Sequence, residues 1–301
     1  MDPKQHNHGN QCDIHNQSSI ATPSNPIEPP RTMHMRHICF GVDKSYATLL
    51  PTLVLSLALN SNERLTFWVA TSTELPLAHI QQIIAAGQPH RTNIINTTAP
   101  SLPANPRAPR HLSDGMYLRL ALPSALPKDV TQYLYLDADI LCTSTRWLQV
   151  FSYQNAAPIS AVADQFTPTW GSGGGIPNVQ GADNHPYFNS GVLLVNREEW
   201  ERRDLTQRAL QYLTASPENR GRFPDQDALN VAAPDWSPLP RHLNYMRVRD
   251  FNYIGYVDPT RASLLHFAGP NKPWQVRRQH SPVEEHYRLA AKRASLLPQH
   301  L

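Results

Sequence analysis

The chain of 301 residues is long enough for one large domain or two small ones, and its formal net charge of +3 gives no indication of nucleic-acid binding. Its three cysteines, Cys12, Cys39 and Cys142, form neither a disulfide framework nor a CxxC pair, which is typical of a protein in a reducing cytoplasm. Because no signal peptide is visible and no apolar run approaches the ~20 residues of a membrane span, we expect a soluble or peripheral protein.

Composition divides the chain into three parts. Residues 1–35 are rich in Asn, Gln, His, Ser and Pro and contain few apolar residues. Such a segment cannot bury enough apolar surface to offset the entropy lost on ordering, so we predict a disordered polar tail. A folded domain is expected over residues 36–274, and a basic helical tail over residues 275–301.

Strand-like and helix-like segments alternate from residue 37 onward. Strands are expected at 37–42, 65–70, 93–96 and 133–136, and helices at 46–59, 77–86 and 116–122. The second half is less regular, with strands at 159–163 and 191–195, a loop rich in Gly, Pro and Asn at 167–184, and a helix at about 197–213. This alternation predicts an α/β fold with a mainly parallel central sheet flanked by helices. Ligands of such sheets bind beyond the carboxyl ends of the strands.

Two aspartates, Asp137 and Asp139, follow directly on the apolar run YLYL at 133–136. Side chains alternate along an extended segment, so both carboxylates point to one side and Ala138 points away. Carboxylates that converge at the end of a buried strand need a positive partner, and hard oxygen ligands suit Mg²⁺ or Mn²⁺. Such an ion commonly holds a phosphate or diphosphate, which makes this motif a candidate for nucleotide-sugar chemistry. The alternative is an ordinary strand-end turn that carries two acids.

Four segments occur together in a characteristic order: FGVDKSY at 40–46, LYLDAD at 134–139, YFNSGVLLVN at 187–196 and HFAGPNKPW at 266–274. With them the chain resembles glycosyltransferase family 8, and it looks most like bacterial lipopolysaccharide and lipo-oligosaccharide α-galactosyl- and glucosyltransferases. The resemblance implies a GT-A type nucleotide-diphosphosugar transferase fold for a catalytic domain at 36–274. It also implies a UDP-galactose or UDP-glucose donor, a Mn²⁺ or Mg²⁺ ion, and transfer with retention of anomeric configuration.

The resemblance assigns roles to single residues as well. It implies that Asp137, Asp139 and His266 bind the metal ion, and that Arg119, Gln226 and Asp227 act in catalysis. Gly41, Asp43, Ser45 and Tyr46 would surround the uridine, although the family often has Asn where Ser45 stands. Gly269 and Lys272 would hold the diphosphate. The remaining donor contacts would come from Arg119, Asp137, Ala138, Asn189, Asp225, Gln226 and Asp227.

Each of these residues also has an ordinary structural interpretation. Asp43 is well placed to cap the helix that follows it, and Arg119 has the surroundings of a solvated side chain on a helix. Asn189 is a common turn residue, and His266 could be a hydrogen-bonded core histidine. The acids at 225–227 would suit a helix N-terminus, a role that is compatible with sugar binding.

The expected chemistry starts from the leaving diphosphate, which gains negative charge as the anomeric C–O bond breaks. A divalent ion and Lys272 would stabilise that charge. We favour a front-side displacement in which the diphosphate takes the acceptor proton and Gln226 stabilises the sugar electrostatically. A carboxylate nucleophile such as Asp227, which would form a covalent sugar intermediate, is the alternative.

Together these features predict a metal-dependent retaining hexosyltransferase that acts on a hydroxyl of a surface glycan such as lipopolysaccharide. The alternatives are a small-molecule or self-glucosylating transferase of the galactinol synthase or glycogenin type, and a stress-related UDP-sugar-binding protein without turnover. We expect a cytoplasmic protein with no nucleic-acid partner. Peripheral docking of the tail 275–301 on the anionic inner face of the membrane is weighed against an ordinary solvated helix, since Glu284 and Glu285 dilute its charge.

Overall fold

A computed structural model describes residues 35–102, 114–153, 156–179, 181–220, 223–246, 261–269, 272–275 and 282–297. The chain divides into two units at residues 33 and 34, and all described residues belong to the second unit. The predicted polar tail at 1–35 lies outside the described residues except for Met35, which opens the first strand. Parts of the predicted C-terminal tail, 276–281 and 298–301, lie outside them as well.

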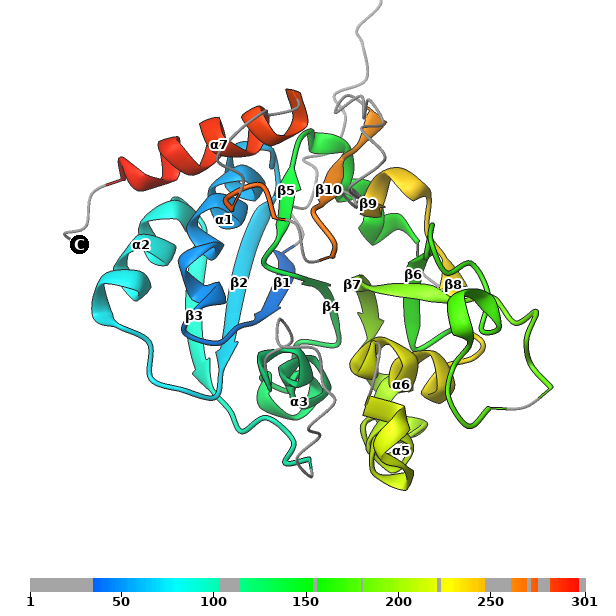
Figure 1. Ribbon diagram of the computed structural model, residues 1–301. Helices are drawn as coiled ribbons and strands as arrows, with labels where there is room; N and C mark the ends of the chain where they lie inside the picture. Colours follow the sequence, from blue (N-terminus) through cyan, green and yellow to red (C-terminus); the bar gives the residue numbers. More distant parts are fainter. Residues whose placement is uncertain are drawn as a thin grey trace, which may run out of the picture. The chain divides into compact units, whose positions relative to one another are not determined.

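A seven-stranded sheet in the order β3-β2-β1-β4-β7-β6-β8 forms the centre of the second unit (Figure 1). The strands β3, β2, β1 and β4 run parallel, while β7 is antiparallel to both of its neighbours. The predicted mainly parallel sheet is therefore confirmed, with one reversed strand. The bounds are β1 Met35–Gly41, β2 Arg64–Thr71, β3 Arg91–Asn96, β4 Gln132–Leu136, β6 Ile159–Ala163, β7 Phe188–Asn196 and β8 Ser237–Pro238.

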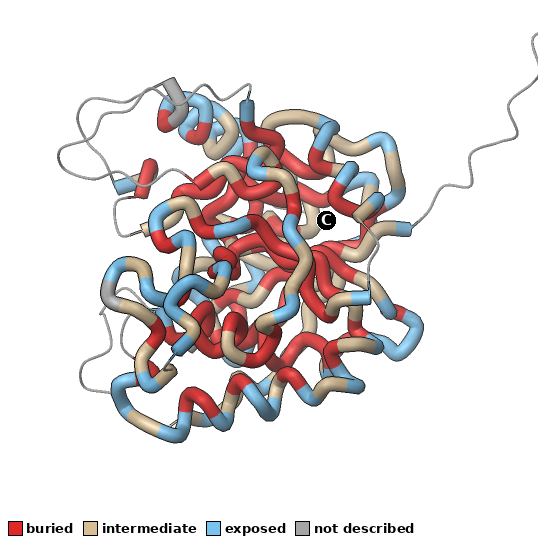
Figure 2. The backbone as a smooth tube through the Cα atoms, turned by 90° about the vertical axis from the view of Figure 1, so that its right-hand side faces the viewer, coloured by how far each residue is buried: buried red, intermediate tan, exposed pale blue. Residues whose placement is uncertain are grey.

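Helices cover both faces of this sheet because its strands are apolar on both sides. Ile38 and Phe40 of β1 pack with α1 and α2, whereas Cys39 between them faces the cluster formed with α3, α5 and α6. Figure 2 shows the buried segments running through the central strands and the exposed ones along the outer helix turns. The bounds are α1 Leu50–Leu59, α2 Leu77–Gly87, α3 Leu118–Ala125, α4 Arg197–Arg202, α5 Leu205–Ala215, α6 Pro224–Ala232 and α7 Pro282–Ser295.

A second, three-stranded sheet has the order β5-β10-β9 and joins the first through the residues 137–139. Its strands are β5 Ile140–Cys142, β9 Tyr245–Met246 and β10 Leu264–His266. At one end of the link, the Asp137 N–H donates to the Gly191 carbonyl of β7 at 2.9 Å. At the other end, the Phe267 N–H, just after β10, donates to the Asp139 carbonyl at 3.0 Å. The two aspartates therefore lie where the two sheets meet.

Two predicted helices are each split in the structure. The helix expected at 197–213 forms as α4 and α5, because Asp204 between them adopts a left-handed conformation with φ of 53°. Aspartate is one of the few residues other than glycine that visits this region readily. The helix expected at 46–59 begins as a short 3-10 helix, η1 Tyr46–Thr48, and continues as α1, whose first turn contains Pro51. Proline suits a first turn because its missing N–H has no partner there.

Short 3-10 helices lie in several of the described connections. They are η2 Asp114–Tyr117, η3 Thr145–Ser152, η4 Ser172–Gly174, η5 Pro217–Arg220 and η6 Arg241–Asn244.

The C-terminal helix α7 packs across α1 and contacts α2 (Figure 1). Its Tyr287 is buried, with the ring centroid 5.2 Å from that of Phe267 and 5.4 Å from that of Trp274. Trp274 therefore packs against α7 and does not line the cavity described below. In the described part of the chain, no helix combines the length and apolarity needed to cross a bilayer.

Candidate active site

A cavity of about 580 Å³ opens where β1, β4 and β6 end and the reversed strand β7 begins. Almost all of the residues that the sequence nominates line it, although they come from segments far apart in the chain. They are Gly41, Asp43, Tyr46, Arg119, Asp137, Ala138, Asp139, Asn189, Asp225, Gln226, His266, Gly269 and Lys272. Ser45 and Asp227 are the two nominated residues that do not.

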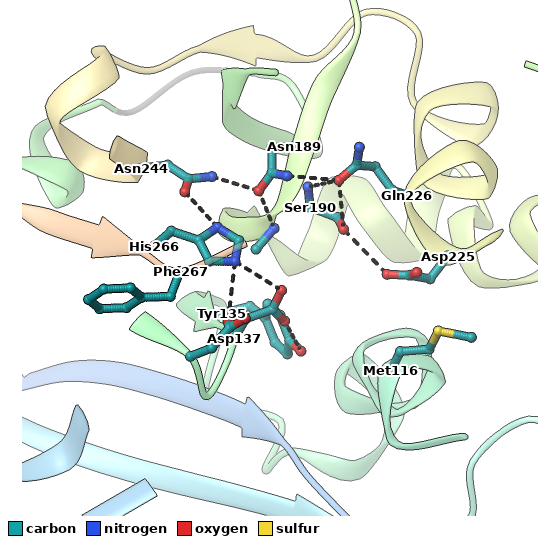
Figure 3. Close-up of polar contacts among 12 residues, drawn as sticks. Met116, Tyr135, Asp137, Asn189, Ser190, Asp225, Gln226, Asn244, His266 and Phe267 are labelled. Carbon is teal, nitrogen blue, oxygen red and sulfur yellow. Dashed lines mark hydrogen bonds and ion pairs between the residues drawn. The ribbon is translucent and has the colours of Figure 1, made fainter. Parts of the chain in front are cut away.

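Three of these side chains form a compact cluster of metal-ligand atoms, and two of them, Asp137 and His266, are labelled in Figure 3. Asp137, Asp139 and His266 each offer one such atom, and the three atoms lie within 4.8 Å of one another. His266 Nε2 is 3.2 Å from Asp139 Oδ1 and 4.0 Å from Asp137 Oδ2. Carboxylate oxygens and one imidazole nitrogen suit Mn²⁺ well and Mg²⁺ acceptably. The donor set therefore fits the divalent ion that the resemblance implies.

Each carboxylate has one oxygen held by the protein and the other turned toward the cluster. Asp137 Oδ1 accepts from Arg119 Nη2 at 2.8 Å and from the Tyr135 hydroxyl at 2.9 Å, which leaves Oδ2 near His266. Asp139 Oδ2 accepts from Lys272 Nζ, which leaves Oδ1 near His266. Hydrogen bonds within the protein thus orient the ligand oxygens.

Electrostatics keep Asp139 ionised despite its burial. Burial alone would raise the pKa of the Asp139 carboxyl, but the Lys272 ammonium beside it holds this pKa well below its ordinary value. For Lys272, burial favours the neutral amine, yet the adjacent Asp139 outweighs it and raises the pKa of Lys272. Both groups are therefore charged at neutral pH, and the carboxylate is available as a ligand.

His266 ends β10 and stacks closely on Gly191 of β7. A methyl group placed on Gly191 would lie 2.4 Å from His266 Cε1 and 3.0 Å from Asp137 Oδ2. Only a residue without a side chain leaves room for the imidazole ring there, since real contacts of this kind are wider. The ring is otherwise buried, with 3 % of the residue exposed.

Arg119 of α3 connects the metal cluster with the first turn of α6. It is 5 % exposed, and its guanidinium donates to Asp137, to the Ser190 carbonyl at 2.7 Å and to the Met116 carbonyl at 2.9 Å. A further ion pair of 3.2 Å joins it to Asp225. These carboxylates raise the pKa of Arg119 even though burial opposes its charge. The interpretation of Arg119 as a solvated surface residue is therefore wrong.

Buried amides and acids form the opposite wall. Gln226 Oε1 accepts from the Ser190 N–H at 2.9 Å and from Asn189 Nδ2 at 3.0 Å. Asn189 Nδ2 also lies 3.2 Å from Asp164 Oδ2, at the end of β6. Burial raises the pKa of the Asp225 carboxyl, and Arg119 partly opposes this shift. This wall presents hydrogen-bonding groups of the kind that recognise sugar hydroxyls.

The uridine-side candidates lie at the end of β1. Asp43 Oδ1 accepts from the N–H groups of Ser45 and Tyr46, both at 2.9 Å, so Asp43 does cap the turn that follows it. Asp43 also lines the cavity, and the two roles coexist. Gly269 adopts a φ of 85°, which glycine tolerates best, at a bend three residues after His266.

Comparisons with known proteins agree with this geometry. Residues 37–277 match the sequence pattern of the family described as Glycosyl transferase family 8. The chain belongs to glycosyltransferase family 8. Lipopolysaccharide glucosyltransferase WaaO of Escherichia coli (strain K12) is 29% identical over 194 residues, which cover 62% of this chain and 56% of that protein. Lipopolysaccharide 1,2-glucosyltransferase of the same strain is 28% identical over 260 residues, 81% of this chain and 74% of that protein.

The fold comparison extends the match over most of the chain. The crystal structure of the galactosyltransferase LgtC in complex with donor and acceptor sugar analogues superposes with a TM-score of 0.70 at 23% identity. The match covers 87% of this chain and 97% of that one. The GT-A fold predicted from the sequence is thereby confirmed.

The two nominated residues outside the cavity have local roles in this family 8 fold. Asp227 is buried, and its Oδ1 accepts a hydrogen bond from the Tyr187 hydroxyl at 2.5 Å. It supports the junction of α6 and β7 and does not form part of the described cavity wall. Ser45 is exposed and contacts Asp43 through its backbone N–H.

Several residues of the site were not nominated from the sequence. Tyr135 could have been, because it stands two residues before Asp137 on the same side of the strand. Asp164 ends a predicted strand and lines the cavity, so its position was a further signal. Gly191 and Asn244 gave no such signal, since only the tertiary fold brings them to His266.

Proposed function

We propose that this family 8 member is a metal-dependent hexosyltransferase whose catalytic domain spans residues 36–274. It takes galactose or glucose from a UDP-hexose and transfers it, with retention, to a hydroxyl of a surface glycan such as lipopolysaccharide. The observation that carries the proposal is the cluster of Asp137, Asp139 and His266 in the wall of the 580 Å³ cavity.

The charge of the cavity supports a divalent cation as part of the donor site. Among the described lining residues, the five aspartates 43, 137, 139, 164 and 225 face the two cations Arg119 and Lys272, which leaves a formal charge of −3 with His266 neutral. A nucleoside diphosphate sugar is itself an anion and would be repelled by such a wall. A divalent ion held by the cluster supplies Lewis-acid stabilisation of the charge that builds on the leaving diphosphate.

The residues around the cluster support a front-side displacement. In this reaction the anomeric C–O bond to the diphosphate breaks, the acceptor oxygen bonds to the same carbon, and the acceptor proton passes to the diphosphate. The acids of the first α6 turn are already engaged, Asp225 with Arg119 and Asp227 with Tyr187, and Asp227 lies outside the described cavity wall. We therefore assign no nucleophile to them. Gln226 is held by β7 and orients the wall against which the sugar would lie.

The acceptor class rests on the relatives. Two of them are named as glucosyltransferases of lipopolysaccharide, and a third, at 26% identity over 79% of this chain, as a lipopolysaccharide 1,3-galactosyltransferase of Salmonella typhimurium. A saccharide of the lipopolysaccharide core is accordingly the acceptor we would try first.

UDP release from a panel of UDP-sugars, with Mn²⁺ or with EDTA, tests the proposal. We expect Mn²⁺-dependent release with UDP-galactose or UDP-glucose, faster when a core saccharide is added. His266→Asn should reduce release by at least about 100-fold, because it removes a metal ligand. His185→Asn is the matched control, since His185 packs on Trp170 and hydrogen-bonds to Pro234 and does not line the cavity.

Release that is equally fast in EDTA would refute the metal assignment. A folded protein that releases no UDP from any donor would instead favour a sugar-nucleotide-binding protein without turnover. A sugar trapped covalently on an enzyme carboxylate would refute the front-side route.

A further inference from the structure

A row of buried side-chain amides leads from the first turn of α6 to the metal-ligand histidine (Figure 3). It runs from Gln226 through Asn189 to Asn244 and ends on His266. Asn244 closes the 3-10 helix η6 directly before β9, and none of its surface is exposed. Asn244 does not line the cavity, and its contact with the site passes through its neighbours.

The polarity of this row is fixed by two backbone donors. The Ser190 N–H lies 2.9 Å from Gln226 Oε1, and the Gly191 N–H lies 3.0 Å from Asn189 Oδ1. A backbone N–H can only donate, so the amide atom that each one meets must be an oxygen. Asn189 must therefore present its NH₂ group to Gln226 and its oxygen to Asn244.

The same logic carries through to the imidazole. Asn189 Oδ1 is an acceptor, so Asn244 offers it Nδ2 at 2.9 Å and turns its own oxygen toward His266. That oxygen, Asn244 Oδ1, lies 3.0 Å from His266 Nδ1. The Nδ1 atom must then carry the hydrogen, which leaves the lone pair of neutral His266 on Nε2. Nε2 is the ring atom that faces Asp137 and Asp139.

We propose that Asn244 is a positioning residue that fixes the orientation and tautomer of His266 as a metal ligand. The inference rests on the proposed metal-dependent function. Groups that hydrogen-bond the second nitrogen of a ligand histidine commonly set metal affinity, and their loss weakens binding about 10- to 100-fold. Here the orienting group is an amide whose own direction is anchored by the backbone of β7.

Mn²⁺ binding to the full-length protein, measured by electron paramagnetic resonance of free Mn²⁺ with and without UDP, tests this role. Asn244→Leu is the main variant, because leucine keeps the volume, excludes water and offers no acceptor to His266. We expect its Mn²⁺ affinity to fall about 10- to 100-fold. Asn219→Ala is the matched control, since Asn219 is equally buried, bonds to the Tyr212 carbonyl and does not line the cavity.

The outcomes separate this inference from the function on which it rests. Wild-type affinity in folded Asn244→Leu overturns the role of Asn244 alone. A wild-type protein that binds no Mn²⁺ overturns the proposed function and the inference with it. An equal loss of affinity in Asn219→Ala would show a general effect of core damage and would also overturn the specific role.

A measurement on the wild-type protein keeps the inference testable if the leucine variant does not fold. Long-range ¹⁵N–¹H correlation spectra of protein labelled at histidine and saturated with diamagnetic Mg²⁺ distinguish which ring nitrogen carries the proton. With the ion bound, we expect the proton of His266 on Nδ1. The signal is assigned by its loss in His266→Asn. A proton on Nε2 would overturn the inference.

Discussion

The substitution Gly191→Ala tests the metal cluster by inserting a single methyl group. In the structure this carbon would lie 2.4 Å from His266 Cε1, 2.8 Å from His266 Nδ1 and 3.0 Å from Asp137 Oδ2. The first two distances are shorter than any that ordinary side chains tolerate, so the imidazole ring must move. The backbone at Gly191 does not itself resist alanine, because its φ is outside the positive range.

The size of the effect differs between stability and metal binding. Overpacking a filled core costs about 1–3 kcal/mol. Replacing glycine by alanine also reduces the conformational entropy of the unfolded chain, which raises the free energy of unfolding by about 0.4–1 kcal/mol. The difference is a net loss of between about 0 and 2.6 kcal/mol in the free energy of unfolding. Metal affinity should fall by at least about 10- to 100-fold, because displacing a ligand disturbs the site more than losing a supporting hydrogen bond.

The assay combines Mn²⁺ titration, UDP release and urea unfolding in a double-mutant cycle with His266→Ala. In the His266→Ala background the methyl group no longer meets a ring, so Gly191→Ala should be neutral or slightly stabilising. The interaction energy between the two substitutions should then be about 1–3 kcal/mol. Wild-type Mn²⁺ affinity in Gly191→Ala, or strictly additive effects in the cycle, would refute the close packing of Gly191 on His266.

Two further predictions follow from buried groups. Asp139→Asn should abolish most Mn²⁺-dependent UDP release. It should also lower the free energy of unfolding by about 3 kcal/mol, because it leaves Lys272 buried without its carboxylate. Unchanged urea unfolding would contradict the pairing of Lys272 with Asp139. In a Cys12→Ser protein, Cys39 and Cys142 should not react with a thiol reagent until urea unfolds the chain, because burial raises the pKa of both thiols; rapid labelling of the native protein would argue against their burial.

The central sheet and the acidic motif could be predicted from the sequence because their signals are local. The strand predicted at 159–163 coincides with β6, and the apolar run at 133–136 ends at Asp137 as expected. Each of these segments carries its own apolar pattern and its own strand end, so no knowledge of distant residues was needed. The family resemblance supplied His266, which has no such local mark.

The supporting residues could not be predicted because their roles depend on the packing of distant segments. Asn244 is the last residue of one very short element and is followed directly by another, so no periodic pattern marks a direction for its side chain. Gly191 was recognised as part of a buried strand, but its closeness to His266 depends on how the two sheets meet. The break at Asp204 depends on a single left-handed residue, which helix periodicity does not reveal.

The link between the two sheets also constrains how this motif can change in length. Asp137 is tied by its N–H to β7 at one end, and Asp139 is tied by its carbonyl to the segment after β10 at the other. A strand that slips by one residue turns every side chain to the opposite face. Inserting or deleting a residue between the aspartates would therefore misplace either the β4–β7 ladder or the β5–β10 ladder. The requirement to fold therefore fixes the link between the two sheets at three residues. A related protein that had lost catalysis would still need a link of this length.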